Sequence, residues 1–229
     1  MSDSAPGAAA VGADAGTVLL VDDDASIRRA MTRLLRAAGF TVSSFPSAAA
    51  LLAATLPDQG PRCLLLDLKM PGKSGLELQG ALGERGLHLP IVFISAHANF
   101  ESGIRALKGG ALDFLRKPVS EDALLAAVER ALAADQTLRA ERHERESLEA
   151  RLHRLTPRER EVFALVTSGL ANKVVAADLG AAEATIKIHR ARVMTKMAAT
   201  SVADLVRMAD KLGLRNEAGP EPVGTLSRR

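Results

Sequence analysis

Carboxylates gather where apolar stretches end in the first half of the chain. Asp22, Asp23 and Asp24 follow the run TVLLV, and Asp67 follows three leucines in the stretch LLLDLKMPGKSG. Acids that converge within a few ångströms repel each other, so they either raise a pKa or hold a hard cation. Magnesium meets that need, because it prefers oxygen ligands, keeps several waters and can bridge to a phosphoryl oxygen. These residue types therefore indicate a divalent-cation site beside a carboxylate that could carry a phosphoryl group.

A hydroxyl and an ammonium follow two further apolar runs. Ser95 closes the run PIVFIS, and Lys117, which precedes Pro118, comes shortly after the run ALDFL. Such groups could bind the remaining oxygens of a phosphoryl group on Asp67. Each signal is weak alone, because an acidic run after a strand is usually a turn and an Asp often caps a helix. A cap at Asp67 would not explain the other three strand ends, whereas Asp24 is expected to cap the next helix or to face solvent.

Short β-rich runs alternate with helical patterns throughout this half. The expected strands span 17–21, 41–45, 63–67, 90–95 and 111–115. The segments between them carry apolar residues at helical spacing, so strand and helix alternate five times. Right-handed crossovers then predict an α/β doubly wound, five-stranded parallel sheet with helices on both faces. The carboxyl ends of parallel strands meet at one edge of such a sheet, which would bring the acids, the hydroxyl and the ammonium together.

The residues around Asp67 also carry backbone and packing signals. Gly72 and Gly75 allow the loop after Asp67 to turn tightly, and Pro71 fixes its φ angle, which would expose the carboxylate to a donor. The single cysteine, Cys63, lies in the apolar run before Asp67. No internal disulfide can form, and a packed strand thiol is expected.

The second half of the chain has a helical pattern. A helix is expected to start at Ser120 and to run without Gly or Pro through a charged stretch. At 156–159, TPRE gives an N-cap threonine, a proline at the first helical position and a glutamate that closes a capping box. Asn172 and Ser201 are expected to cap two further helices, and another spans about 183–197. Four short helices in about 60 residues predict an all-α helix-turn-helix bundle.

Cations concentrate in this bundle. Residues 156–215 hold 10 Lys/Arg against 6 Asp/Glu, a net charge of +4, compared with +3 for the whole chain. On the helix at 183–197 the residues that could contact nucleic acid are Thr185, Lys187, His189, Arg190, Arg192 and Lys196. Such a helix can lie in the major groove, although a solvated basic face is the alternative interpretation. Because Trp and Tyr are absent, duplex DNA is favoured over single strands or RNA.

The stretches VDDD, DLKMPGKSG, ISAH and DFLRKP resemble, in order and spacing, the receiver domain of FixJ-like two-component response regulators. The resemblance covers residues 17–133 and implies that Asp67 is the phosphoacceptor. It also implies that Mg²⁺, or another divalent cation, is bound by Asp22, Asp23, Asp67 and the backbone carbonyl of Lys69. By this resemblance the protein is not an enzyme that acts on other substrates. At most it catalyses its own phosphorylation and the hydrolysis of its own aspartyl phosphate.

The same resemblance assigns three more residues. Ser95 and Lys117 would sense the phosphoryl group, and Phe114 would be the switch aromatic, although a core phenylalanine is an equally open interpretation. His97, two residues beyond Ser95, is expected to be an exposed loop residue rather than a metal ligand or a catalytic group.

Residues 155–214 resemble the LuxR-type DNA-binding domain of the NarL group over nearly its whole length. By this resemblance Lys187, Ile188 and Ala191 face the bases, while Lys173, Arg190 and Arg192 contact phosphates. One departure from the family is Ala182, where a Ser or Thr often precedes the glutamate. Alanine cannot cap the recognition helix, at a cost of up to about 1 kcal/mol of local stability.

These patterns predict five segments: a flexible tail (1–16), the receiver (17–133), a charged helical linker (134–154), the DNA-binding domain (155–215) and a second flexible tail (216–229). Leucines form an interrupted apolar stripe along the linker helix, at 125, 132, 138, 148, 152 and 155. A coiled-coil dimer stem and a solvated signalling linker both fit that stripe.

The expected function is transcriptional regulation. A sensor histidine kinase would phosphorylate Asp67, and the change would modulate dimerisation and sequence-specific binding to promoter DNA. RNA polymerase is a further candidate partner. Neither a membrane span nor a signal peptide is evident, so a cytoplasmic protein without a membrane partner is expected. One alternative is a constitutive LuxR-type regulator that is never phosphorylated; a haloacid-dehalogenase-like phosphotransferase is disfavoured because Lys69 stands where its second acid is needed.

Overall fold

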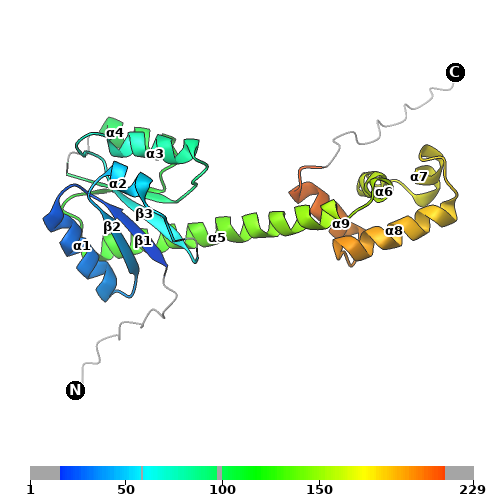
Figure 1. Ribbon diagram of the computed structural model, residues 1–229, viewed down its shortest axis with the longest axis horizontal. Coiled ribbons are helices and arrows are strands. Elements are labelled where there is room, and N and C mark those ends of the chain that lie inside the picture. The colour runs from blue at the N-terminus through cyan, green and yellow to red at the C-terminus, as the bar shows by residue number, and fades with distance from the viewer. Residues whose placement is uncertain (1–15, 58, 97–99, 215–229) are drawn as a thin grey trace, which may run out of the picture. The chain divides into compact units, whose positions relative to one another are not determined.

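The computed structural model describes residues 16–57, 59–96 and 100–214 (Figure 1). The chain divides into two compact units between Arg139 and Ala140. The first contains five parallel strands: β1 (Thr17–Val21), β2 (Thr41–Phe45), β3 (Arg62–Asp67), β4 (Ile91–Ser95) and β5 (Asp113–Arg116). Their order in the sheet is β2-β1-β3-β4-β5, which confirms the predicted doubly wound topology.

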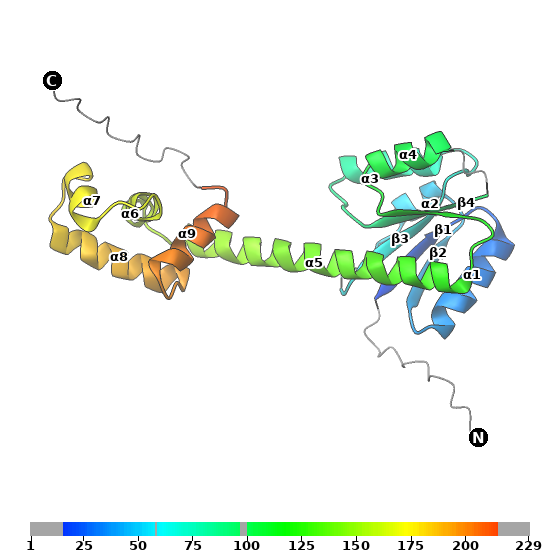
Figure 2. The ribbon, with the colours of Figure 1, turned by 180° about the vertical axis from the view of Figure 1, so that it is seen from behind.

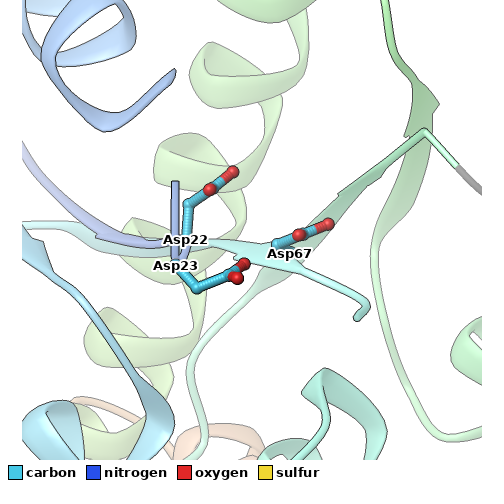
Figure 3. A group of neighbouring side chains, drawn as sticks. All are labelled: Asp22, Asp23 and Asp67. Atoms are coloured by element: carbon cyan, nitrogen blue, oxygen red, sulfur yellow. The ribbon is translucent and has the colours of Figure 1, made fainter. Parts of the chain in front are cut away.

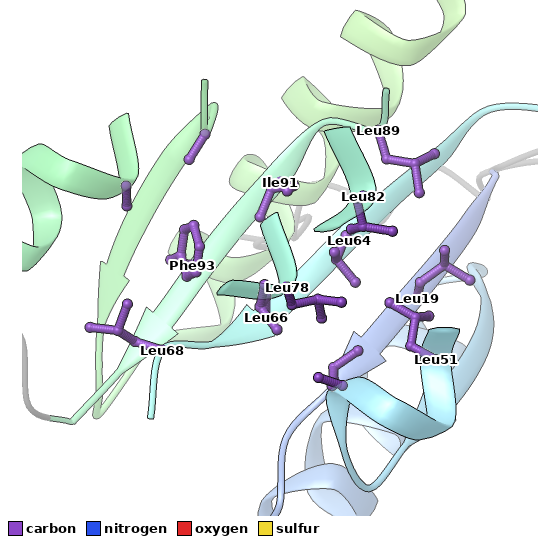
Figure 4. Close-up of a cluster of buried hydrophobic side chains, with 14 of the residues drawn as sticks. Leu19, Leu51, Leu64, Leu66, Leu68, Leu78, Leu82, Leu89, Ile91 and Phe93 are labelled. Atoms are coloured by element: carbon purple, nitrogen blue, oxygen red, sulfur yellow. The ribbon is translucent and has the colours of Figure 1, made fainter. Parts of the chain in front are cut away.

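Helices cover both faces of this sheet (Figures 1 and 2). They are α1 (Ala25–Ala37), α2 (Ala48–Ala53), α3 (Gly75–Glu84), α4 (Phe100–Lys108) and α5 (Glu121–His153). One core cluster joins alternate strand residues such as Leu64 and Leu66 to α2, α3 and α4 (Figure 4). The other joins Cys63 and Leu65 to α1 and α5. Since neighbouring residues of a strand point to opposite faces, the continuous apolar run of β3 is explained by burial on both sides.

Two details of this unit refine the sequence prediction. Cys63 is fully buried, and burial raises the pKa of its thiol to about 12, so it packs as a small apolar group. Strand β5 begins two residues later than predicted. The N–H of Ala111 still bonds to the carbonyl of Ala106, so this residue belongs to the turn that ends α4.

Helix α5 is a single 33-residue helix. Its first turns bury Leu124, Ala127 and Val128 against the sheet, and the buried Asp135 accepts a 2.7 Å hydrogen bond from the backbone N–H of Arg62 at the start of β3. Toward its other end, Leu148 is buried in the core of the second unit.

Most leucines of the predicted stripe are therefore occupied within one unit or the other. Leu132 is buried in the first unit and Leu155, just beyond α5, in the second, with Leu125 and Leu152 packed at the margins of the same two cores. Leu138 is the one member of the stripe that is largely exposed, at 45%. Little apolar surface remains in the middle of α5 to hold a second helix, so the structure favours the solvated linker over the coiled-coil stem.

The second unit consists of the end of α5 and four short helices, α6 (Pro157–Thr167), α7 (Asn172–Asp178), α8 (Glu183–Met197) and α9 (Val202–Lys211). The predicted capping box of Thr156 and Glu159 is confirmed, as is the cap at Ser201. Helix α8 follows Ala182 without a side-chain cap, as the sequence indicates.

The prediction that Asn172 caps α7 is wrong. Ala171 occupies the cap position without a side-chain hydrogen bond, and Asn172 is the first helical residue. Its side-chain oxygen instead accepts a hydrogen bond from Arg190 on α8. A long-range partner has replaced the local cap. None of the described helices combines the length and apolar content needed to cross a membrane.

Candidate functional site

Three carboxylates meet at the carboxyl ends of β1 and β3. One oxygen from each of Asp22, Asp23 and Asp67 lies within 4.8 Å of the others (Figure 3). Strands β1 and β3 are paired in register up to Val21 and Leu66, so Asp22, which follows β1, and Asp67, which ends β3, emerge side by side. The sheet thus brings together residues 45 positions apart in the sequence, as the strand pattern predicts.

Asp22 is almost fully buried, with 2% of its surface exposed, and its carboxylate is satisfied from two sides. One oxygen accepts a hydrogen bond from the ammonium of Lys117 at 2.7 Å, and the other accepts one from the backbone N–H of Asp24 at 2.8 Å. The Arg28 guanidinium donates to the backbone carbonyls of Asp22 and Asp23, at 2.7 and 3.0 Å. Asp24 itself caps α1, as expected. The acidic loop is therefore held in place by backbone and side-chain hydrogen bonds.

Lys117 lies between the two strand ends. Its Nζ is 3.7 Å from an oxygen of Asp67, in addition to the shorter contact with Asp22. Its backbone N–H donates to the carbonyl of Ser95 at 2.9 Å, and Ser95 is buried at the end of β4. The peptide bond between Lys117 and Pro118 is cis. The two proposed sensors are thus adjacent at the same edge of the sheet as the acids.

The charge of the cluster suits a divalent cation. Three carboxylates and one ammonium leave a net charge of about −2 in a partly dehydrated site. Burial raises the pKa of Asp67, and the neighbouring Asp22 charge acts in the same direction, while Lys117 lowers it. A hard cation held by carboxylate oxygens would relieve the same repulsion. The three carboxylates of Asp22, Asp23 and Asp67 therefore form a donor set that could hold a divalent cation such as Mg²⁺.

The loop after Asp67 needs its glycines for two different reasons. Gly72 adopts a φ of 79°, the left-handed region that the predicted tight turn requires. Gly75, at the start of α3, instead lies against the end of β3, because an added Cβ would be 2.5 Å from the backbone oxygen of Asp67. Lys69, with an exposed side chain, lies in this loop two residues beyond Asp67.

Phe114 packs in the core beside the site. The Phe114 ring stacks on Phe93, with centroids 6.3 Å apart, and packs against the core cluster that α2, α3 and α4 share. This contact fits both a core residue and an aromatic at the margin of the site. His97 lies outside the described residues.

In the second unit, α8 presents two different faces. Ile186, Val193 and Met197 are buried in the core. The opposite face exposes several of the residues predicted to contact DNA, namely Thr185, Lys187, Ile188, Ala191 and Arg192, and Lys173 is exposed on α7. Lys187 also makes a 3.4 Å ion pair with Glu183 one turn earlier.

Three other residues predicted to contact DNA, Arg190, Lys196 and His189, are only partly exposed. Arg190 donates to the Asn172 side chain at 2.8 Å, and Lys196 donates to the buried Glu159 at 2.6 Å. His189 is partly buried, and its Nδ1 has no hydrogen-bond partner within the described part of the chain. Arg190 thus holds α8 against α7, and Lys196 holds it against α6. The sequence places Glu159 correctly in a capping box, but nothing local indicates its second partner 37 residues away.

The Glu159–Lys196 pair makes the second unit sensitive to acid. Hydrogen bonds from Lys196 first, and from the backbone of Thr156, lower the pKa of Glu159 from 4.5 to about 2. A depressed carboxyl pKa stabilises the fold above pH 4.5, and that contribution is lost as the pH falls toward 2. We expect Glu159→Gln to lower the free energy of unfolding by about 2 kcal/mol at pH 7. The difference from wild type should shrink between pH 4.5 and 2.

Urea denaturation followed by the NMR methyl signal of the buried Ile186 would measure this unit alone. Glu161→Gln is the matched control, because Glu161 lies on the same helix but is half exposed and pairs with Arg158. A wild-type-to-variant difference that stays constant with pH would contradict the role of Glu159.

The fold and the acidic site define a receiver followed by a helical DNA-binding unit, and comparisons with known proteins agree. The family model described as "Response regulator receiver domain" matches residues 18–129, and that of "Bacterial regulatory proteins, luxR family" matches residues 153–209. Nodulation protein W of Bradyrhizobium diazoefficiens is 46% identical over 197 residues, which cover 86% of each chain. Transcriptional regulatory protein FixJ of Azorhizobium caulinodans is 40% identical over 193 residues, covering 84% of this chain and 90% of FixJ.

Among solved structures, that of the response regulator StyR aligns with a TM-score of 0.76 and 44% identity over 86% of this chain and 98% of StyR. The chain belongs to the two-component response regulators that carry a LuxR-type DNA-binding domain.

Proposed function

We propose that Asp67 accepts a phosphoryl group from a sensor histidine kinase and that this modification controls binding of the second unit to promoter DNA. The observation that carries the proposal is the convergence of three carboxylates within 4.8 Å, with Lys117 in contact with both Asp22 and Asp67. A simple helix cap or turn would not require an ammonium and two further acids at the same place. In this arrangement an oxygen of Asp67 forms the bond to phosphorus while the bond from phosphorus to the donor's histidine nitrogen breaks.

The surrounding residues position the acceptor. Asp22, Asp23, Asp67 and the carbonyl of Lys69 would hold Mg²⁺, which offsets negative charge on the transferring group when bound. Lys117 is within reach of one phosphoryl oxygen, and Ser95 on the neighbouring strand would take another. Phosphorylation adds a charge of about −1.5 to −2, so the side chains of Lys117 and Ser95 would be drawn toward Asp67. Phe114 would then move into the space that Ser95 vacates.

The second unit supplies the output. Lys187, Ile188 and Ala191 would face the bases, while Lys173 and Arg192 contact phosphates, because all five are exposed. The bonds of Arg190 to Asn172 and of Lys196 to Glu159 favour a positioning role for these two cations. Thr185 lies on the exposed face of α8 and His189 beside it, at the margin of the same surface.

Two copies joined through their phosphorylated receivers would bind paired half-sites in the DNA. Binding of the first copy would raise the effective concentration of the second, and the affinity of the pair would increase. The protein would act in the cytoplasm, where its proposed partners, a kinase donor, promoter DNA and RNA polymerase, are found. The receiver is assigned to 17–133, the linker to 134–154 and the DNA-binding domain to 155–215.

The test is the affinity of the full chain for a duplex that it selects from a random library, measured with and without a small phosphodonor and Mg²⁺. We expect the phosphodonor to tighten wild-type binding about tenfold or more and to leave Asp67→Asn unchanged. Equal affinity of treated and untreated wild type, after labelling has been verified, would favour a constitutive DNA-binding regulator instead.

A further inference from the structure

Arg28, at the end of the first turn of α1, folds back over the loop that leads from β1 into this helix. One nitrogen of its guanidinium donates to two consecutive backbone carbonyls, that of Asp22 at 2.7 Å and that of Asp23 at 3.0 Å. Lys117, by comparison, contacts the carboxylates of Asp22 and Asp67 directly. These two cations therefore make different kinds of contact with the acidic site.

The peptide group between Asp23 and Asp24 connects Arg28 to the acids. This peptide is trans, so its C=O and N–H lie in one plane and point in opposite directions. On one side, the Asp23 carbonyl accepts the hydrogen bond from Arg28. On the other side, the N–H of Asp24 donates to one carboxylate oxygen of Asp22 at 2.8 Å, while Lys117 donates to the second oxygen. The orientation of the Asp22 carboxylate therefore depends on a peptide plane that Arg28 holds.

The charge of Arg28 and its hydrogen bonds should affect a bound cation in opposite directions. A guanidinium is always protonated, so its charge repels a divalent cation nearby and should weaken binding. Hydrogen bonds that orient metal ligands should strengthen binding, and the loss of such outer contacts typically lowers metal affinity by about 10- to 100-fold. Because the two effects differ in sign, the change in Mg²⁺ affinity on removal of Arg28 shows which of them dominates.

We infer that Arg28 is a positioning residue for the divalent cation. It holds the peptide plane that orients the Asp22 carboxylate, so the ligand is arranged before the ion binds. The inference rests on the proposed function, since it takes Asp22, Asp23 and Asp67 as the ligands of Mg²⁺. Arg28 acts through backbone groups and leaves the negative charge of the three carboxylates available to the ion.

The test is an NMR titration of the full chain with MgCl₂ in the absence of a phosphodonor. Arg28→Met removes the charge and the donors but keeps an unbranched side chain, and Arg28 is only partly buried, so the variant should fold. We expect this change to weaken Mg²⁺ binding about tenfold or more. Arg28→Lys retains a charge and a donor and should recover part of the affinity.

Two further measurements separate positioning from a general effect of charge or folding. The amide proton of Asp24 should shift in Arg28→Met even without Mg²⁺, because its hydrogen bond to Asp22 is loosened, whereas amides in the middle of β3 should keep their wild-type shifts. Arg29→Met is the matched control, since Arg29 is the next residue of α1, is exposed and bonds to the hydroxyl of Ser26. It should leave Mg²⁺ affinity within about twofold of wild type, because solvent and salt screen an exposed charge.

Mg²⁺ binding by Arg28→Met that equals or exceeds that of the wild type would overturn the inference and leave the proposed metal site intact. Should Arg28→Met fail to fold, the comparison of Arg28→Lys with the wild type decides in the same way. If the wild type itself binds no Mg²⁺, the metal site of the proposed function fails and the inference fails with it.

Discussion

Replacing Asp67 by asparagine should abolish covalent labelling of the chain by a small phosphodonor in the presence of Mg²⁺. The amide lacks the anionic oxygen that would form the bond to phosphorus. Asp22 is buried and paired with Lys117 at 2.7 Å, so its oxygens are already engaged. Intact-protein mass spectrometry would measure the effect as the phosphorylated fraction, which should fall from a clear signal in the wild type to background.

Asp24→Asn is the matched control for this experiment. Asp24 lies at the same edge of the sheet, but its carboxylate accepts the backbone N–H groups of Ser26 and Ile27, and asparagine can cap a helix equally well. Its labelling should equal that of the wild type. Equal labelling of Asp67→Asn and the wild type would show that another residue accepts the phosphoryl group.

Replacing Gly75 by alanine should lower the stability of the receiver and distort the loop that follows Asp67. The new Cβ would lie 2.5 Å from the backbone oxygen of Asp67, 2.9 Å from the Phe93 ring and 3.1 Å from the Cα of Leu68. The nearest of these atoms is backbone, so α3 or the end of β3 must shift. Overpacking of this kind costs about 2 kcal/mol, and the shift would slow labelling of Asp67 as well.

Thermal unfolding monitored by circular dichroism would measure the stability change, and the rate of phosphodonor labelling would measure the effect on the site. Gly80→Ala is the matched control, because Gly80 lies in the same helix and an added Cβ there meets nothing within 4 Å. Alanine at that position should stabilise α3 by up to about 1 kcal/mol. If Gly75→Ala and Gly80→Ala unfold at the same temperature and label at the same rate, the close approach at Gly75 is not a constraint.

The sequence predicts the receiver fold well, because its signals are local and repeated. Apolar runs of strand length, separated by helical patterns, locate β1 to β4 within one residue of their observed starts and ends. The topology then follows from the handedness of parallel crossovers. The acid cluster is predicted for the same reason, since residues at the carboxyl ends of adjacent parallel strands must meet.

The sequence does not predict individual contacts between residues that lie far apart along the chain. Asn172 has the type and position of a helix cap, yet it bonds to Arg190, 18 residues later. Asp135 binds the backbone of Arg62 across 73 residues. Gly75 looks like a turn glycine, but its requirement is steric, and it depends on how closely α3 passes the end of β3. Such features follow from packing in three dimensions rather than from any periodic pattern.

The two faces of α8 also separate what evolution can change from what it must keep. The buried Ile186 and Val193, together with the bonds of Arg190 and Lys196, hold the helix in its unit. Ile188 and its exposed neighbours do not contribute to that packing. If α8 reads the operator as proposed, substitutions on its exposed face alone would change the preferred DNA sequence, while the contacts that hold the helix in its unit stay intact.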